Sequence, residues 1–409
     1  MSNTKRSFGK SYYLLIAVQT FTSAAFYVTA PILTKYLVGS GMAVALAGTV
    51  AGLISLTALV VRPFSGLLAD RIDPKLLLLL SIPLLAVSTY GYAISTAAAP
   101  IFFFRVLNGI AFCLNGTTII AFSCRFIPKE RMAEGIGYQG LGNVLASAVG
   151  PGIGLSVCHN WGYRATFACG AAMALIGLIF LVPVRSLPAN AAADAGESRQ
   201  KHGTASFGIS SFIAVSVLPI AFLSGMFSYS NGTVTNFLVL VTEENGVERI
   251  SLYYTVIAVT MVLLRFTTGR LCDRYGIKFI LIPAYVFTAV GLLLIARTSS
   301  AVMIAAVGVL MAFGQGGGSP ALLSQAVKTV SSDRSGVATG TYYIFLDVFQ
   351  GISPIVGGAL VTAAGTYRAP FYLASALLIF GLVLYLLTEK RVLNKERSES
   401  CRPQRIWNG

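Results

Sequence analysis

The sequence predicts an all-α integral membrane protein in which twelve transmembrane helices form two pseudo-symmetric six-helix bundles, and three observations point to this fold class. The chain of 409 residues is 55% hydrophobic and 11% charged, with a mean hydropathy of +0.75, whereas an average soluble domain contains about 25% charged residues. About a dozen apolar runs of roughly 20 residues, each able to cross ~30 Å of hydrocarbon, occupy most of the length. The third observation is that the second half of the chain repeats the first.

The repeat is carried by charged residues and prolines that recur in the same order. Residues 62–78 align without gaps with residues 265–281, an offset of 203 residues. Chance identity among Gly, Ala and Leu is common in apolar sequence, but ordered recurrence of charged residues is not. The chain therefore consists of two copies of one unit. The same offset maps Arg131 onto Arg334, Gly137 onto Gly340, Pro151 onto Pro354 and Gly154 onto Gly357.

The apolar runs define each predicted span. Because they are continuous and do not alternate with a period of two residues, they indicate helices and not the strands of a membrane barrel. The first and seventh runs are long enough to tilt or bend. The expected spans of the first half lie near residues 12–38, 42–66, 76–97, 100–123, 134–157 and 166–185. Those of the second half lie near residues 208–240, 249–269, 279–297, 301–327, 336–362 and 369–388.

The distribution of basic residues predicts the orientation in the membrane. An even number of spans places both termini on one face, and the loops assigned to that face carry most of the Lys and Arg residues. By the positive-inside rule this face is cytoplasmic. The predicted organisation is an N-terminal bundle (1–187), a cytoplasmic linker rich in Ala, Ser and Gly (188–206), a C-terminal bundle (207–389) and a basic cytoplasmic tail (390–409).

The formal net charge of +15 follows from the same asymmetry and favours contact with anionic lipid head groups. The sequence offers no soluble basic domain to nucleic acid, so we expect the lipid bilayer, and no nucleic acid, as the partner of these charges. His159 and His202 have no companion at metal-ligand spacing, so no metal is expected. Cys158 and Cys169 flank a predicted extracytoplasmic loop, and their spacing alone leaves a disulfide open.

Two loops on the predicted cytoplasmic face carry one motif, which reads GLLADRIDPK at residues 66–75 and GRLCDRYGIK at residues 269–278. It resembles the G-x-L-x-D-R-x-G-[RK]-[RK] loop signature of the major facilitator superfamily, although Asp73 and Pro74 replace the usual Gly and basic residue. Glycine lets helices approach closely, and an Asp near a helix end can find its partner in only one of two bundle arrangements. For the basic residues, a loop that merely orients the protein is an equal alternative. The expected conformational latch comprises Gly66, Asp70, Arg71, Lys75, Gly269, Asp273, Arg274 and Lys278.

The resemblance covers essentially the whole chain and implies the major facilitator fold, in which two six-helix bundles rock around a central cavity. It implies secondary active transport by alternating access. Similarity to the 12-helix drug:proton antiporter group favours proton-coupled efflux of a small organic or amphipathic compound by a monomer in the bacterial cytoplasmic membrane. A proton-coupled importer or a uniporter of a small metabolite is the alternative, since the fold supports both. An integral-membrane enzyme or sensor is a weaker alternative because the sequence has no nucleophile elbow, metal cluster or phosphate loop, and no cofactor is expected.

Two glycine-rich spans contain prolines at matched positions. The G-P-x-x-G element near residues 134–157 resembles one found in proton-coupled exporters of the superfamily, and a related pattern occurs near residues 336–362. Proline bends a helix by freeing a backbone carbonyl, and glycine permits close packing. A generic packing face of a pseudo-symmetric bundle is the alternative. The expected hinge residues are Gly150, Pro151, Gly154, Pro354 and Gly357.

Ionisable side chains within the predicted spans are few, and two of them stand out. Arg105 begins an R-x-x-x-G element similar to the one that the superfamily associates with proton coupling; an Arg that snorkels to the outer interface is the alternative. Asp347 is the only acid deep within a span, and dehydration penalises its charged form, so it could load and release a proton. It could instead bind a cationic substrate or form a structural ion pair, with Arg105 as a candidate partner.

Polar and aromatic residues within the spans are candidates for the substrate cavity. Amide side chains deep in a bilayer either hydrogen-bond a neighbouring helix or face water, and we expect about half of these to serve only the first purpose. Aromatic and amide groups together suit amphipathic organic solutes. The candidates are Gln19, Tyr27, Asn108, Asn115, Gln139, Asn143, Tyr229, Asn231, Asn236, Gln315, Tyr342 and Tyr343.

Overall fold

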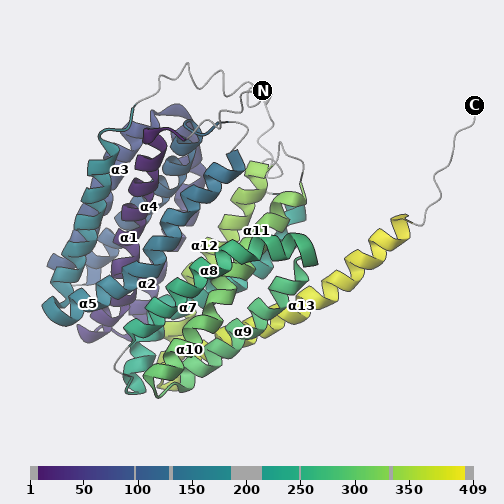
Figure 1. The fold of residues 1–409 in the computed structure, drawn as a ribbon. Helices are drawn as coiled ribbons and strands as arrows, with labels where there is room; N and C mark the ends of the chain where they lie inside the picture. The colour runs from purple at the N-terminus through teal and green to yellow at the C-terminus, as the bar shows by residue number, and fades with distance from the viewer. Residues whose placement is uncertain are drawn as a thin grey trace, which may run out of the picture.

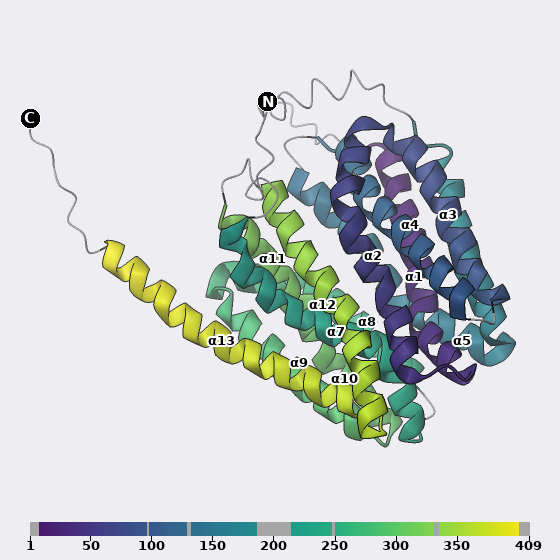
Figure 2. The ribbon, with the colours of Figure 1, turned by 180° about the vertical axis from the view of Figure 1, so that it is seen from behind.

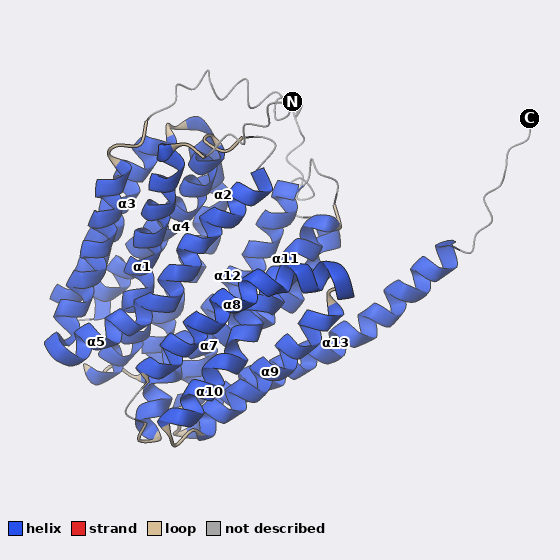
Figure 3. Ribbon diagram, in the orientation of Figure 1, coloured by secondary structure: helices blue, strands red, loops and turns tan. Residues whose placement is uncertain are grey.

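The computed structural model describes residues 8–95, 98–128, 132–185, 214–247, 250–330 and 335–400, and every regular element within these ranges is a helix (Figure 3). The helices of the first half are α1 (Lys10–Gly39), α2 (Val44–Arg71), α3 (Pro74–Ile94), α4 (Ala98–Cys124) and α5 (Met132–Leu181). Those of the second half are η3 (Val215–Val217), α7 (Leu218–Glu244), α8 (Ser251–Tyr275), α9 (Lys278–Arg297), α10 (Ala301–Ala312), η4 (Phe313–Gly318), α11 (Ser319–Lys328), α12 (Ser335–Ala364) and α13 (Ala369–Ser400).

Most helices lie where the apolar runs predict spans, and three differ in an instructive way. α5 covers the fifth and sixth expected spans, and Gly162, with φ of 79°, breaks it between them. The tenth expected span consists of α10, α11 and the intervening π-helix η4. α13 continues past residue 388, where the twelfth span is expected to end, and extends beyond the other helices (Figures 1 and 2).

Among the described residues, nine helices are long and apolar enough to cross a membrane. One of the nine, Tyr138–Leu181, covers most of two expected spans, and Ser251–Leu264 of α8 is a shorter apolar helix. The all-helical architecture is therefore as predicted, while the count of twelve crossings stays a prediction. The domain boundaries also stay predictions, because the linker 188–206 lies outside the described residues.

Helices α1 to α5 lie together in one group, and α7 to α13 lie together in a second group beside it (Figures 1 and 2). We call these groups the N bundle and the C bundle. We call the face at which α1 begins the terminal face, and the face at which it ends the distal face. Across the boundary between the bundles, α2 packs against α12, α5 against α8 and α1 against α7.

The bundles are in close contact near the distal face. A Cβ atom on Gly48 of α2 would overlap the carbonyl oxygen of Pro354 on α12, so the crossing of these helices requires a residue without a side chain there. Nearby, Thr34 of α1 donates a hydrogen bond of 3.0 Å to Asn236 Oδ1 of α7. The next residue of α1, Lys35, forms an ion pair with Glu243 of α7. On the distal side, α2 is therefore in contact with α12 and α1 with α7, while an open hollow lined by α1, α5 and α7 lies beside these contacts.

Candidate functional site: a central cavity and an ion pair between the bundles

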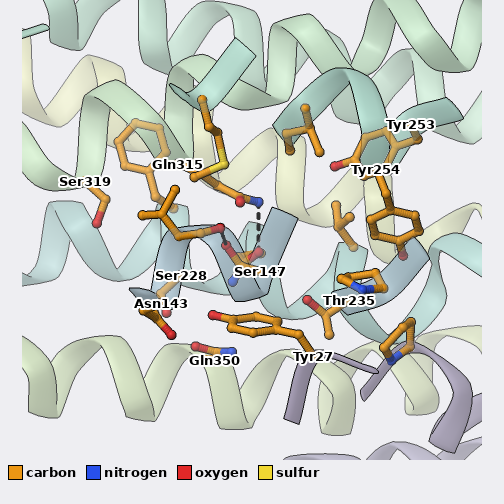
Figure 4. A pocket seen from close by; sticks show the side chains of 18 of the residues that line it. Tyr27, Asn143, Ser147, Ser228, Thr235, Tyr253, Tyr254, Gln315, Ser319 and Gln350 are labelled. Carbon is orange, nitrogen blue, oxygen red and sulfur yellow. Dashed lines mark hydrogen bonds between the residues drawn. The ribbon is translucent and has the colours of Figure 1, made fainter. Parts of the chain in front are cut away.

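A cavity of about 240 Å³ lies between the bundles, near the middle of the helices (Figure 4). Its walls come from α1 and α5 of the N bundle and from α7, α8, η4, α11 and α12 of the C bundle. None of the described residues that line it carries a formal charge. Its polar lining consists of Tyr27, Asn143, Ser147, Ser228, Asn231, Thr235, Tyr253, Tyr254, Gln315, Ser319 and Gln350.

Four of the predicted cavity residues line this space, and they form two hydrogen-bonded pairs. On the N-bundle side, the side chain of Tyr27 from α1 is hydrogen-bonded to that of Asn143 from α5. On the C-bundle side, Gln315 Nε2 of η4 donates to Asn231 Oδ1 of α7 at 2.8 Å (Figure 4). The cavity is thus bordered by an amide-containing pair from each bundle.

The other four predicted candidates of the N bundle do not line the cavity, and three of them join helices within the bundle. Asn108 of α4 donates to the hydroxyls of two α3 residues, and Asn115 of α4 accepts a bond from Ser81 of α3. Gln139 of α5 donates to a backbone carbonyl of α1 at 3.3 Å. Gln19 donates to Ser23 on its own helix. Asn108, Asn115 and Gln139 thus connect neighbouring helices, which is a common use of a polar side chain in lipid.

The remaining C-bundle candidates also lie away from the cavity lining. Tyr342 is buried and bonded to Ser224 and to the carbonyl of Ser319. Tyr229 is buried as well, and Tyr343 lies beside Arg62, whose guanidinium carbon is 5.8 Å from the ring centroid. Asn236 takes part in the distal contact between the bundles.

The largest omission of the sequence-based prediction is α8, which contributes Tyr253 and Tyr254 to the cavity. Both rings are almost fully buried, and neither hydroxyl has a hydrogen-bond partner among the described residues. Their span begins near the expected membrane boundary, where aromatic residues are common for interfacial reasons. Two adjacent tyrosines at the start of an apolar run are therefore a weak signal of a binding site.

Asp347 of α12 pairs with Arg62 of α2, and this pair crosses the bundle boundary. Arg62 Nε donates to Asp347 Oδ2 at 2.6 Å, and a second guanidinium nitrogen lies 2.5 Å from the same oxygen. The side chains are 27% and 15% exposed, respectively, so the pair is only partly screened by solvent. The sequence contained a signal for this partner, because Arg62 falls within the apolar run 42–66, where an uncompensated cation is costly.

Arg105 is not the partner of Asp347. Its side chain is 3% exposed and donates to two backbone carbonyls of α2, from Nε to Val50 at 3.2 Å and from a terminal nitrogen to Ala51 at 2.9 Å. The guanidinium therefore turns into the N bundle and does not snorkel outward. In this position Arg105 ties α4 to the same helix that carries Arg62.

The predicted hinge glycines make close contacts within each bundle. A Cβ on Gly154 would overlap the Val28 carbonyl of α1, and one on Gly150 would lie 2.7 Å from the Tyr27 side chain. A Cβ on Gly357 would lie 2.5 Å from the Phe237 ring of α7. Pro151 lines the cavity, and Pro354 lies at the crossing of α2 and α12. These contacts agree with the packing alternative, and bending at the prolines stays a prediction.

Only part of the predicted latch can be placed. Lys75 Nζ donates to the carbonyls of Val182 and Val184 at 3.0 and 2.6 Å, so it caps the end of α5 within the N bundle. Arg274 lies over the ring of Tyr275, with 5.3 Å to its centroid, and Lys278 begins α9. Gly66, Asp70, Arg71, Gly269 and Asp273 lie on α2 and α8, but their side chains and local packing are outside the described part of the structure.

The comparison with known families decides the identity of this architecture. The profile of the Major Facilitator Superfamily matches residues 14–230 and 218–407. The chain belongs to this superfamily. It is accordingly a multi-pass membrane transporter of small molecules and not an enzyme, as the loop motif and the repeat predict.

Curated relatives align with nearly the full length of this superfamily member. Multidrug resistance protein 1 of Bacillus subtilis (strain 168) is 26% identical over 373 residues, which cover 83% of this chain and 87% of the relative. Multidrug resistance protein MdtG of Klebsiella pneumoniae (strain 342) is 24% identical and covers 94% and 93%. Quinolone resistance protein NorA of Staphylococcus aureus (strain MRSA252) is 21% identical and covers 88% and 92%.

Solved structures share the fold of this transporter. The nucleoside transporter NupG superimposes with a TM-score of 0.71 at 14% identity, covering 93% of this chain and 100% of the other. A bacterial homologue of the human lysosomal transporter Spinster, in an inward-facing and unoccupied conformation, gives 0.74 at 15% identity, covering 96% and 99%. At these identities the likeness concerns the fold alone.

Cys113, Cys158 and Cys169 are free thiols. The disulfide that the spacing of Cys158 and Cys169 left open is therefore not formed. The turn at Gly162 between the two halves of α5 is instead defined by backbone conformation.

Proposed function

We propose that this transporter is a proton-coupled antiporter that exports a small organic or amphipathic compound by alternating access. The three multidrug and quinolone resistance proteins among its relatives support export. The basic loops on the terminal face support a cytoplasmic location of both termini in a bacterial inner membrane. Two bundles enclosing one cavity form a complete transport unit, which supports a monomer.

The ion pair between Arg62 and Asp347 is the observation that carries this proposal. The two groups belong to different bundles, so their attraction favours the arrangement in which α2 and α12 are in contact. Protonation of the carboxyl would remove its charge and weaken this attraction, and separation of the bundles would expose the carboxyl to the opposite solution. Alternating access and proton binding are then linked through one side chain.

The interaction free energy of the pair is of the size that a conformational switch requires. A coupling free energy of about 1–3 kcal/mol changes the ratio of two states by roughly 5- to 150-fold. A partly exposed ion pair contributes within this range, because solvent screens it less than a surface pair and desolvation costs less than for a fully buried one. A much stronger pair would hold the transporter in one state.

Transport in proteoliposomes with an imposed pH gradient and an internal pH dye tests the proposal. Lipophilic cations, zwitterionic metabolites, organic anions and neutral amides are screened as substrates. We expect one class to move protons in the opposite direction, and we expect Asp347→Asn to abolish the proton movement while the protein still folds. Glu243→Gln is the matched control, since it removes a second ion pair that joins the bundles, at the distal face, and proton movement should persist. Unchanged transport and proton movement in Asp347→Asn would exclude Asp347 from the coupling mechanism.

A further inference from the structure

We infer that the central cavity selects an uncharged, planar solute that carries a hydrogen-bond donor and an acceptor side by side, such as a heteroaromatic lactam or an aromatic amide. Gln315, Asn231, Tyr253 and Tyr254 are the residues to which we assign this selectivity. The inference rests on the proposed transport function, because it specifies the compound that the central cavity would carry.

The first support is the absence of charge from the lining. None of the described lining residues is Asp, Glu, Lys, Arg or His, and the nearby ion pair between Arg62 and Asp347 is neutral as a unit. A cation or anion that entered this space would lose its hydration without gaining a counter-ion. An uncharged solute avoids that cost. The cavity of about 240 Å³ also favours a small solute.

The second support is the amide pair between η4 and α7. The single bond from Gln315 Nε2 to Asn231 Oδ1 uses one donor and one acceptor. Gln315 Oε1 and Asn231 Nδ2 then remain to accept and to donate, and both residues line the cavity. A solute with an adjacent N–H and C=O complements this arrangement with two hydrogen bonds. An N-methylated solute of the same shape lacks the donor and leaves one protein group unpaired.

The local sequence explains why η4 presents a single amide side chain, that of Gln315, to the cavity. η4 reads FGQGGG, so Gln315 is the only polar side chain of the π-helical turn. The neighbouring glycines allow close packing: a Cβ on Gly314 would overlap Thr288, and one on Gly318 would lie 2.8 Å from the ring of Phe227. Single π-helical turns occur frequently at functional sites. Here the turn directs Gln315 toward Asn231 at the cavity (Figure 4).

The third support is independent of the amides. Tyr253 and Tyr254 are 1% and 7% exposed, both line the cavity, and neither hydroxyl has a partner among the described residues. Buried hydroxyls are normally paired, so each of these two would gain a hydrogen bond from a solute that reaches it. Phe227, Ile257 and Met261 supply apolar wall against which a planar ring can pack. The cavity thus combines unpaired polar groups with flat apolar surface.

Equilibrium binding to the purified protein in lipid nanodiscs, without a pH gradient, tests the inference. The neutral probes are uracil, 2-pyridone and benzamide, each compared with the derivative in which every N–H is methylated (1,3-dimethyluracil, N-methyl-2-pyridone and N,N-dimethylbenzamide), and the charged probes are benzoate and tetraphenylphosphonium. We expect at least one neutral parent compound to bind at least tenfold more tightly than its N-methylated derivative and more tightly than both ions. Tightest binding by an ion, equal binding of parent and methylated compounds, or no binding by any neutral probe would overturn the inference.

Substitutions test whether Gln315 and Tyr254 cause the preference for the neutral parent compounds. Gln315→Leu should weaken binding of the neutral parent at least tenfold and leave the methylated derivative unchanged, and Tyr254→Phe should weaken it several-fold. Tyr229→Phe is the matched control, because Tyr229 has a buried, unpartnered hydroxyl that does not line the cavity, and binding should not change. If Gln315→Leu and Tyr254→Phe both bind like the wild type, the assigned residues are wrong.

The binding assay separates this inference from the proposed antiport. Binding of a neutral probe with no proton movement in proteoliposomes would refute proton coupling and leave the selectivity intact. Proton-coupled transport of tetraphenylphosphonium, with no binding of neutral probes, would refute the selectivity and leave the antiporter intact.

Discussion

Removal of the Arg62–Asp347 pair should open the distal contact between the bundles by an amount that can be calculated from its geometry. Two unit charges about 4 Å apart attract by about 4 kcal/mol at an effective dielectric constant of 20, and the N–O distances of 2.5 and 2.6 Å in this pair make its bare attraction at least as large. Exposures of 27% and 15% and the desolvation of both groups reduce the net contribution, for which we take about 2 kcal/mol. This corresponds to roughly a 30-fold change in the ratio of the two states.

The assay is a distance measurement between spin labels at Ser40 and Ser299, in a background without native cysteines. These residues are exposed at the distal ends of the N and C bundles, so their separation increases when the distal side opens. Arg62→Gln or Asp347→Asn alone should increase the long-distance population about 30-fold, because each leaves an uncompensated group. The double variant lacks the same attraction, so it should shift the population by about the same factor, roughly 30-fold, and not by the roughly 900-fold product that two independent charges would give.

The control and the refuting result are both specific. Arg368→Gln removes a guanidinium that contacts Glu244 and Asn245 within the C bundle, and the distances should stay as in the wild type. Equal distance distributions in the wild type and both single variants would show that the pair does not stabilise the distal contact. Strict additivity in the double variant would show that the two charges do not act on each other.

Two further predictions concern the interface and the latch. Gly48→Leu should separate α2 from α12 and slow transport at least tenfold, because the side chain would meet the Pro354 carbonyl. Gly152→Leu is the control and should transport normally, because a Cβ at this position meets open space. Normal transport by both variants would refute the packing argument. Asp70→Ala should change the balance between inward-open and outward-open states, measured by the accessibility of engineered cysteines on both sides of the cavity. Asp73→Ala is the control: it removes the 3.0 Å hydrogen bond that caps the Lys75 backbone amide in the same loop, and it should only lower the free energy of unfolding by about 1 kcal/mol. If the engineered cysteines are equally accessible in both variants, the latch is refuted.

The sequence predicted the helical architecture and the family because these depend on properties that are local or repeated. Continuous apolar runs locate helices without any knowledge of their neighbours. The recurrence of residues 62–78 at 265–281 is visible in the amino-acid order alone and identifies two homologous units. The loop motif then indicates the superfamily, whose profile matches both halves.

The site was predicted less completely, since a membrane helix is apolar around most of its circumference. In soluble proteins the polar side of a helix faces water, but a polar residue in a span can face either a neighbouring helix or the cavity. Asn108 and Asn231 are both amides deep in apolar runs, yet the first joins α4 to α3 and the second lines the cavity. The amino-acid sequence around each residue does not show whether its side chain faces a neighbouring helix or the cavity.

The partner of Asp347 was missed for a related reason. Arg62 lies 285 residues away in the other half of the chain, so the contact depends on how the two bundles pack. The repeat does not reveal it either, because the position matched to Asp347 in the first half is Val144. The pair therefore breaks the pseudo-symmetry of the molecule. An asymmetric charge is found only when the bundles are placed against each other.

The proposed proton site and the proposed solute site converge on one helix of this transporter. On α12, Asp347 faces Arg62, while Leu346 and Gln350 line the cavity, and the Leu346 carbonyl accepts a 2.7 Å hydrogen bond from Ser228. A movement of α12 that separates the ion pair must also displace this part of the cavity wall. A solute that fits only one position of the wall would then change the proton affinity of Asp347, and by thermodynamic linkage a proton on Asp347 would change the solute affinity by the same factor. The test is to measure solute affinity as a function of pH in the wild type and in Asp347→Asn. If the affinity does not change with pH in the wild type and equals that of Asp347→Asn, α12 is not the element that couples the two sites.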